Sequence, residues 1–291
     1  MTLEFGRIIT AMVTPFDGQG EVNYSEAIRL ADHLYQTGTD AIVLAGTTGE
    51  SPTLTHQEEF ELFKVIRKAF PGRKIIAGTG SNCTRTAVSS TKEAAELGMD
   101  GVLQVVPYYN RPSQEGCYQH FKAVSEATSL PVMLYNIPGR TGRNLEPETV
   151  ARLAELPTIF SIKEAAGSVD QVKTIRKLTP PEFLIYSGDD GLTLEFMTEG
   201  AVGIVSVAAH IVGNQMAQMI KAFVAGDSET ARRLETELRP IFEVLFITSN
   251  PTPLKAALPL FGFKVGNPRL PLVAATTEEI AIIAERCKSL I

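Results

Sequence analysis

A lysine at the end of an apolar run is the residue whose position most suggests chemistry in this sequence. Lys163 follows the run Ile-Phe-Ser-Ile at residues 159–162. Apolar surroundings disfavour the charged ammonium and favour the free amine. A free amine attacks a carbonyl carbon and forms a Schiff base, so Lys163 is a candidate nucleophile toward a keto acid. The alternative is a lysine that reaches solvent or pairs with the adjacent Glu164.

Other residues could hold the carboxylate of such a substrate. In GTTGE, residues 46–50, two threonines stand between glycines. Glycines let backbone N–H groups approach a small anion, and the hydroxyls of Thr47 and Thr48 add donors. The same pattern also occurs in ordinary tight turns, where Glu50 would be a structural carboxylate that accepts from loop amides. Arg140 could clamp a carboxylate in bidentate fashion or lie on the surface.

Two tyrosines, Tyr109 and Tyr135, stand on turns bounded by apolar residues or prolines. A tyrosine in such a place commonly buries its ring and hydrogen-bonds its hydroxyl. Beside a Schiff-base lysine and a threonine hydroxyl, the two would instead offer a path for protons. The four histidines show no metal-ligand spacing, and the Asp189–Asp190 pair is better placed to cap a helix, so we expect no metal.

Eight short apolar runs, each followed by an amphipathic helical stretch, must position these residues. Their near-continuous apolar character is typical of parallel strands that are covered on both faces. The candidate residues follow the ends of these runs, where barrel enzymes carry their reacting groups. We therefore predict an α/β fold, a (β/α)₈ TIM barrel, over residues 1–226. The eight runs are residues 7–11, 41–44, 74–77, 101–106, 131–135, 158–163, 182–186 and 203–207.

A doubly wound open sheet is the alternative architecture. Such a sheet usually carries a glycine-rich fingerprint after its first strand, and here that turn reads TPF at residues 14–16. Residues 227–291 show only helical pattern and predict a C-terminal helical extension that is suited to subunit contacts.

The composition of the chain argues against several other classes of protein. The chain of 291 residues is 44% hydrophobic, and its net charge of −6 comes without a basic run, so we expect no nucleic-acid partner. Three cysteines at irregular spacing fit neither a disulfide framework nor a zinc site. No apolar run reaches about 18 residues, so we expect no membrane span, no signal peptide and a cytoplasmic location.

Seven motifs, in order and with matching spacing along the whole chain, resemble the dihydrodipicolinate synthase family of class I aldolase-type lyases. This family belongs to the pyruvate lyase group that includes N-acetylneuraminate lyase. The motifs are GTTGES at 46–51, AGTGSN at 77–82, PYYNRPSQEG at 107–116, YNIPGRTG at 135–142, IKEA at 162–165, SGDD at 187–190 and NPTPLK at 250–255.

The resemblance implies a role for each matching residue. Pyruvate forms a Schiff base with one lysine and condenses with L-aspartate 4-semialdehyde, in the first committed step of diaminopimelate and lysine biosynthesis. It implies no cofactor, and a homotetramer built as a dimer of dimers. The implied roles are Schiff-base formation for Lys163, proton transfer for Tyr135 with Thr47 and Tyr109 (the last from a neighbouring subunit), pyruvate binding for Thr48, Val205 and Gly188, and binding of the second substrate's carboxylate for Arg140.

The resemblance extends to a pocket at which lysine inhibits some members. Ser51, His56, Asn82 and Tyr108 agree with that pocket, whereas Pro52, Glu59 and Thr86 replace an alanine, a histidine and a glutamate. Loss of the glutamate removes the natural partner of the lysine ammonium, although Glu59 could substitute for it. We predict weak or absent inhibition by lysine.

Two other functions remain open at this stage. A lyase that cleaves N-acetylneuraminate or a 2-keto-3-deoxy sugar acid would share the lysine and tyrosine but needs a pocket for polyol hydroxyls. A non-catalytic barrel that binds a small molecule would have lost a nucleophile or relay residue, whereas Lys163, Tyr135, Thr47 and Tyr109 are all present.

Overall fold

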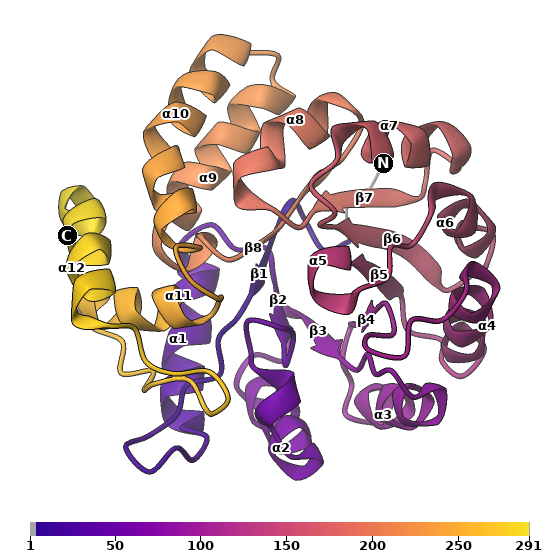
Figure 1. Cartoon of the computed structure of the whole chain (residues 1–291), viewed down its shortest axis with the longest axis horizontal. Helices are drawn as coiled ribbons and strands as arrows, with labels where there is room; N and C mark the ends of the chain where they lie inside the picture. Colours follow the sequence, from indigo (N-terminus) through magenta and orange to yellow (C-terminus); the bar gives the residue numbers. More distant parts are fainter. Residues whose placement is uncertain (1–3, 291) are drawn as a thin grey trace. The chain divides into compact units, whose positions relative to one another are not determined.

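The eight strands of this chain form a closed barrel in chain order (Figure 1). The computed structural model describes residues 4–290; residues 1–3, at the start of the predicted barrel region, and residue 291 lie outside the described residues. The closed barrel of eight strands, with helices between them, confirms the predicted (β/α)₈ fold. The strands are β1 Ile8–Ala11, β2 Ala41–Leu44, β3 Lys74–Gly78, β4 Gly101–Val105, β5 Val132–Asn136, β6 Ile159–Glu164, β7 Leu184–Ser187 and β8 Gly203–Ser206.

The strands form where the sequence is apolar and β-branched. All four residues of β2 and all five of β5 are buried, as expected for parallel strands with both faces covered. Predicted and observed strands coincide closely. The largest offset is at the start of β7, which was expected at residue 182 and begins at Leu184.

Helices follow the strands, and local capping explains where several begin. Thr55 and Glu58 form a capping box before α2, and Asp227 accepts from the backbone N–H of Thr230 before α10. The α-helices are α1 Tyr24–Gln36, α2 His56–Ala69, α3 Thr84–Glu96, α4 Gln114–Ser125, α5 Pro138–Thr141, α6 Pro147–Ala154, α7 Val169–Leu178, α8 Thr193–Thr198, α9 Ala209–Val224, α10 Ser228–Val244, α11 Thr252–Ala257 and α12 Thr277–Cys287. Short 3₁₀ helices are η1 Ser51–Thr53, η2 Asp190–Leu192, η3 Leu258–Phe261 and η4 Lys288–Leu290.

The described chain divides into two compact units. The first contains the residues before Ile8 together with Lys74–Val205, and in it α6 packs between α4 and α7. The second contains Ile8–Arg73 and the residues from Ser206 onward; in it α10 packs along α9, and α12 lies against α10 and α11 (Figure 1). The division of the sequence at residue 226 stays a prediction.

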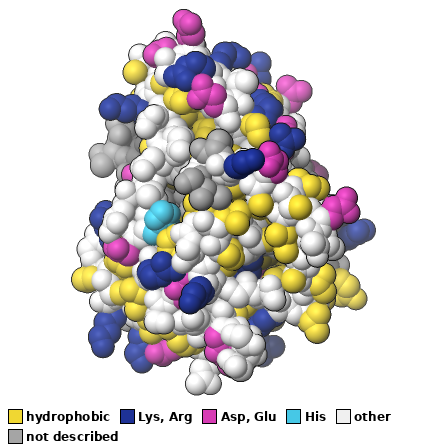
Figure 2. All heavy atoms as spheres, turned by 90° about the vertical axis from the view of Figure 1, so that its left-hand side faces the viewer, with side chains coloured by type: hydrophobic (Ala, Val, Ile, Leu, Met, Phe, Trp, Pro, Cys, Tyr) yellow, Lys and Arg dark blue, Asp and Glu magenta, His cyan; other side chains and the backbone are white. Residues whose placement is uncertain are grey.

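No helix among residues 4–290 is long and apolar enough to cross a membrane. Figure 2 shows acidic and basic side chains interspersed over one face of the molecule rather than gathered by sign, in keeping with the dispersed charges of the sequence.

Candidate active site

Lys163 and Tyr135 lie side by side on neighbouring strands of the first unit. The two residues are register partners between β5 and β6. The Lys163 ammonium nitrogen lies 4.4 Å from the centroid of the Tyr135 ring, and both side chains are buried. The strand ends thus bring the Lys163 nitrogen and the Tyr135 phenol ring together out of water. The roles predicted for the two residues stay predictions.

Glu164 has partners of its own on the other face of β6, because successive side chains of a strand point to opposite faces. Its carboxylate accepts hydrogen bonds from the amides of Asn136 and Gln171 and from the backbone N–H of Ala166. Burial raises the pKa of the Glu164 carboxyl. These bonds commit Glu164 to amide donors and disfavour the alternative in which it pairs with Lys163.

Gly188 leaves the room that the Lys163 side chain occupies. A Cβ at this position would lie 3.1 Å from Cε of Lys163 and 2.7 Å from Cβ of Ala165. Only a glycine fits such a close approach without movement of its neighbours. Val205, on β8 of the same unit, is buried.

Tyr109 is not part of the buried lysine–tyrosine pair in this chain. Its side chain is 90% exposed and its backbone adopts a left-handed conformation with φ of +72°. Tyr108 is also exposed, and Arg140 lies exposed on the short helix α5. Each of these three side chains is exposed, whereas those of Lys163 and Tyr135 are buried.

The GTTGE loop lies in the second unit, where its backbone is tightly packed. A Cβ on Gly49 would lie 3.0 Å from the backbone nitrogen of Ala45, and the Thr14 hydroxyl donates to the Gly49 carbonyl over 2.6 Å. Thr48 is buried and Thr47 is half-buried. The loop is therefore a fixed turn.

Three polar partners of this loop could not be predicted from the sequence. Asn250 donates to the Thr48 hydroxyl oxygen, Lys255 pairs with Glu50, and the backbone N–H of Arg269 donates to Glu50. The NPTPLK motif contains Asn250 and Lys255, but the motif alone gives no sign of what these residues contact.

His210 is buried, and both of its ring nitrogens have hydrogen-bond partners within the fold. His210 hydrogen-bonds the Val207 carbonyl through Nδ1 and accepts the Val13 N–H through Nε2. Burial lowers the pKa of His210 to about 4, so it is neutral at pH 7. Among residues 4–290, no group of three or more His, Cys, Asp or Glu side chains is arranged to hold a metal ion.

Comparison with known proteins shows the family of this chain. The model of the dihydrodipicolinate synthetase family matches residues 4–289. The chain belongs to this family. A 4-hydroxy-tetrahydrodipicolinate synthase from Cyanothece is 60% identical over 273 residues, which cover 93% of each chain. The predicted membership of a family of class I aldolase-type lyases is thus confirmed.

Solved structures of dihydrodipicolinate synthases have the same fold. The enzyme from Cyanidioschyzon merolae with lysine bound is 49% identical, with 98% of each chain covered and a TM-score of 0.97. The chloride-inhibited enzyme from Acinetobacter baumannii complexed with pyruvate is 40% identical, with a TM-score of 0.96 over 99% of this chain and 100% of that chain.

The residues that the resemblance assigns to a lysine pocket lie on exposed or half-buried segments. His56 is the exposed first residue of α2, and its ring lies 4.3 Å from that of Phe60. Ser51 and Asn82 are half-buried. Burial, with the charge of Glu58 adding to it, raises the pKa of Glu59 to about 8. At pH 7 Glu59 is mostly uncharged, which makes it a poor substitute for the missing glutamate.

Proposed function

We propose that this member of the dihydrodipicolinate synthetase family is a 4-hydroxy-tetrahydrodipicolinate synthase, which condenses pyruvate with L-aspartate 4-semialdehyde. The observation that carries the proposal is the buried contact between Lys163 and the Tyr135 ring at the carboxyl ends of β5 and β6. A lysine so placed is held out of bulk water beside a group that can exchange protons.

The chemistry follows from the two residues. The Lys163 amine adds to the pyruvate ketone, and loss of water forms the imine. Loss of a methyl proton, with Tyr135 assisting proton transfer, gives the enamine. The enamine carbon bonds to the aldehyde carbon of the second substrate, whose oxygen takes up a proton. The amino group of that substrate then displaces Lys163 from the imine carbon and closes the ring.

Other residues have binding roles in this proposal. Thr47 and Tyr109 complete the proton relay with Tyr135, and Thr48, Val205 and Gly188 hold pyruvate. Arg140, exposed on α5, binds the carboxylate of the second substrate, which an arginine can do in bidentate fashion. The protein supplies the electron sink through the Schiff base, so the reaction needs no cofactor.

We propose that the enzyme is a cytoplasmic homotetramer, a dimer of dimers, in which Tyr109 serves the neighbouring subunit. An aromatic side chain that is 90% exposed on a turn with positive φ has no packing role in its own chain. A place in the partner's relay would explain that conformation. The three cysteines are free thiols, in agreement with a reducing compartment.

The test is pyruvate consumption with aspartate semialdehyde, compared with N-acetylmannosamine and with glyceraldehyde, in the wild type and in Lys163→Ala. Turnover with aspartate semialdehyde alone, lost in the variant, is expected. Turnover with a sugar aldehyde instead would assign the chain to the sugar-acid lyases and would reject the role given to Arg140.

A further inference from the structure

The NPTPLK motif contacts the GTTGE loop from more than 200 residues away along the chain. The Asn250 side-chain amide donates to Oγ1 of Thr48 over 2.9 Å. The Lys255 ammonium lies 2.5 Å from Oε1 of Glu50. The proposed function uses the loop but gives no role to these two C-terminal residues.

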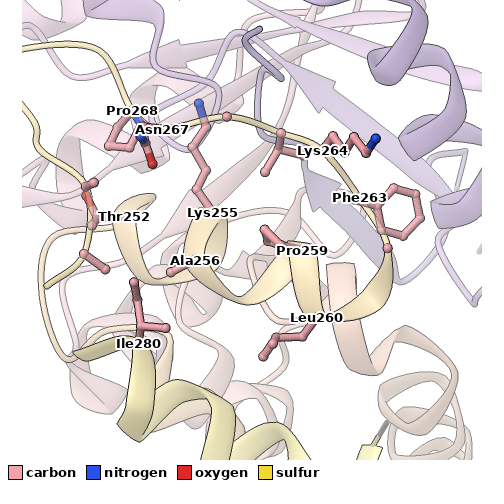
Figure 3. Close-up of a pocket in the computed structure, with 15 residues that line it drawn as sticks. Thr252, Lys255, Ala256, Pro259, Leu260, Phe263, Lys264, Asn267, Pro268 and Ile280 are labelled. Atoms are coloured by element: carbon pink, nitrogen blue, oxygen red, sulfur yellow. The ribbon is translucent and has the colours of Figure 1, made fainter. Parts of the chain in front are cut away.

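Lys255 is buried and directed at a single carboxylate. It is 3% exposed, and its ammonium also lies 3.9 Å from the centroid of the Phe16 ring. Figure 3 shows its side chain extending from α11 toward the segment that carries Lys264 and Asn267. Burial lowers the pKa of Lys255 to about 8, while the Glu50 charge acts in the opposite direction. A buried side chain keeps its charge in the folded protein only when an opposite charge pairs with it.

Glu50 is the last residue of the loop, and both its backbone and its side chain are constrained. Its backbone adopts a left-handed conformation with φ of +59°, which a residue with a side chain seldom adopts. Its N–H donates to the Thr47 carbonyl, and its second carboxylate oxygen accepts the N–H of Arg269. A carboxylate held on two sides fixes the turn that contains both threonines.

Asn250 determines the direction of hydrogen bonding at Thr48. A hydroxyl has one hydrogen to donate and two lone pairs that accept. Because the Asn250 amide nitrogen can only donate, Thr48 accepts in this bond and keeps its own hydrogen for another partner. Both side chains are buried, so water does not compete for that hydrogen. A carboxylate, which only accepts, is the partner that suits such a hydroxyl.

We propose that Asn250 and Lys255 are positioning residues for the pyruvate site: Lys255 fixes the loop through Glu50, and Asn250 directs the Thr48 hydroxyl toward the pyruvate carboxylate. This inference rests on the proposed function, because it requires that the loop bind pyruvate. It predicts that both residues govern the affinity for pyruvate and have little effect on the second substrate.

The experiment traps the Schiff base with borohydride in the wild type, Asn250→Asp and Lys255→Met. Hydride adds to the imine carbon and the nitrogen takes a proton, which leaves a stable secondary amine that is counted by intact-protein mass. The pyruvate concentration for half-maximal trapping is expected to rise at least about tenfold in both variants, as for loss of a hydrogen bond to a charged group. In steady state, KM for aspartate semialdehyde stays unchanged and kcat falls less than the pyruvate affinity.

Two further variants separate positioning from stability. Thr252→Val removes the bond from Thr252 to the Val273 carbonyl at the start of the same helix, and is expected to lower Tm without changing half-maximal trapping. Glu50→Gln combined with Lys255→Met leaves no unpaired charge and is expected to recover most of the pyruvate affinity that Lys255→Met loses. If Lys255→Met does not fold, half-maximal trapping in Asn250→Asp alone tests the proposed positioning role.

The outcomes that reject the two proposals differ. Half-maximal trapping in folded Asn250→Asp and Lys255→Met at the wild-type pyruvate concentration would overturn the inference and leave the proposed function intact. Absence of trapping in the wild type would overturn the proposed function and, with it, the inference.

Discussion

The Lys163 ammonium faces the ring of Tyr135 from 4.4 Å, across the register of two adjacent parallel strands. The contact divides the tyrosine into two parts with separable roles. The ring provides an electron-rich face beside the amine, and in the proposed mechanism the hydroxyl takes part in proton transfer. A phenylalanine at this position keeps the ring and removes the hydroxyl.

Tyr135→Phe is therefore expected to lower kcat by about 10²-fold or more, the usual contribution of a positioned acid–base group. Lys163 keeps its neighbour, so pyruvate should still be trapped on it by borohydride. Stopped-flow and steady-state assays with aspartate semialdehyde measure the loss. A variant with wild-type kcat would show that the hydroxyl takes no part in proton transfer.

Gly188→Ala is expected to displace Lys163. The added Cβ would lie 3.1 Å from Cε of Lys163 and closer still to Cβ of Ala165, so side chains must shift. We expect kcat/KM to fall at least about tenfold, and stability to fall by about 1–3 kcal/mol as in other overpacked sites. Kinetics and thermal unfolding measure the two effects.

Gly191→Ala is the matched control for Gly188→Ala, in the same segment after β7. Its added Cβ meets Oδ1 of Asp189 at 3.4 Å, which is ordinary van der Waals contact. Equal losses of kcat/KM in the two variants would contradict a specific role for the space beside Lys163.

The barrel and the lysine could be predicted because their signals are local. Each strand is a short apolar run, and Lys163 follows one directly, so its place at a strand end needs no knowledge of distant contacts. Because successive side chains of a strand point to opposite faces, Lys163 and Glu164 lie on opposite faces of β6. The fact that they are neighbours in the sequence does not by itself show whether they pair.

The contacts that hold the threonine loop could not be predicted in the same way. Asn250 and Thr48 are 202 residues apart, and helical periodicity in the C-terminal region shows which residues share a face but not what that face touches. The alternative in which Glu50 accepts from loop amides agrees with its bond from the backbone N–H of Arg269, but it gave no sign of the pairing with Lys255. The exposure of Tyr109 could be expected only from the family resemblance, because a partner in another subunit leaves no pattern in the sequence of one chain.

His210→Gln tests how a buried neutral imidazole affects the pH dependence of stability. Folding lowers the pKa of His210 from about 6.5 to about 4, because the ring is buried. Between these values the unfolded chain binds the extra proton, so the folded state loses stability as pH falls from 6.5 toward 4. The shift corresponds to about 3 kcal/mol at the acid end of this range.

Denaturant unfolding of the wild type and of His210→Gln at a series of pH values measures this effect. The difference between the two proteins isolates His210 from Glu59, whose raised pKa acts with the opposite sign. We expect the wild type to exceed the variant most above pH 6.5 and progressively less below it. A difference that does not vary with pH would show that His210 does not titrate on unfolding.

Inhibition by lysine is expected to be weak at pH 7 and to become stronger in Thr86→Glu. The variant places a carboxylate at an exposed position on α3, where the resemblance implies a partner for the lysine ammonium. A charge-assisted bond to the lysine ammonium should lower the half-inhibitory concentration by about tenfold or more. Thr86→Gln, of the same length without the charge, is the control.

The pH dependence of this inhibition distinguishes the two carboxylates. The Glu59 carboxyl, with its pKa raised to about 8, is uncharged at pH 7 and ionises as pH rises through 8. Residual inhibition of the wild type should therefore strengthen above pH 8, and Glu59→Gln should abolish that increase without an effect at pH 7. Inhibition of the wild type at sub-millimolar lysine and pH 7 would contradict the prediction, because it would require a partner for the ammonium other than Glu59.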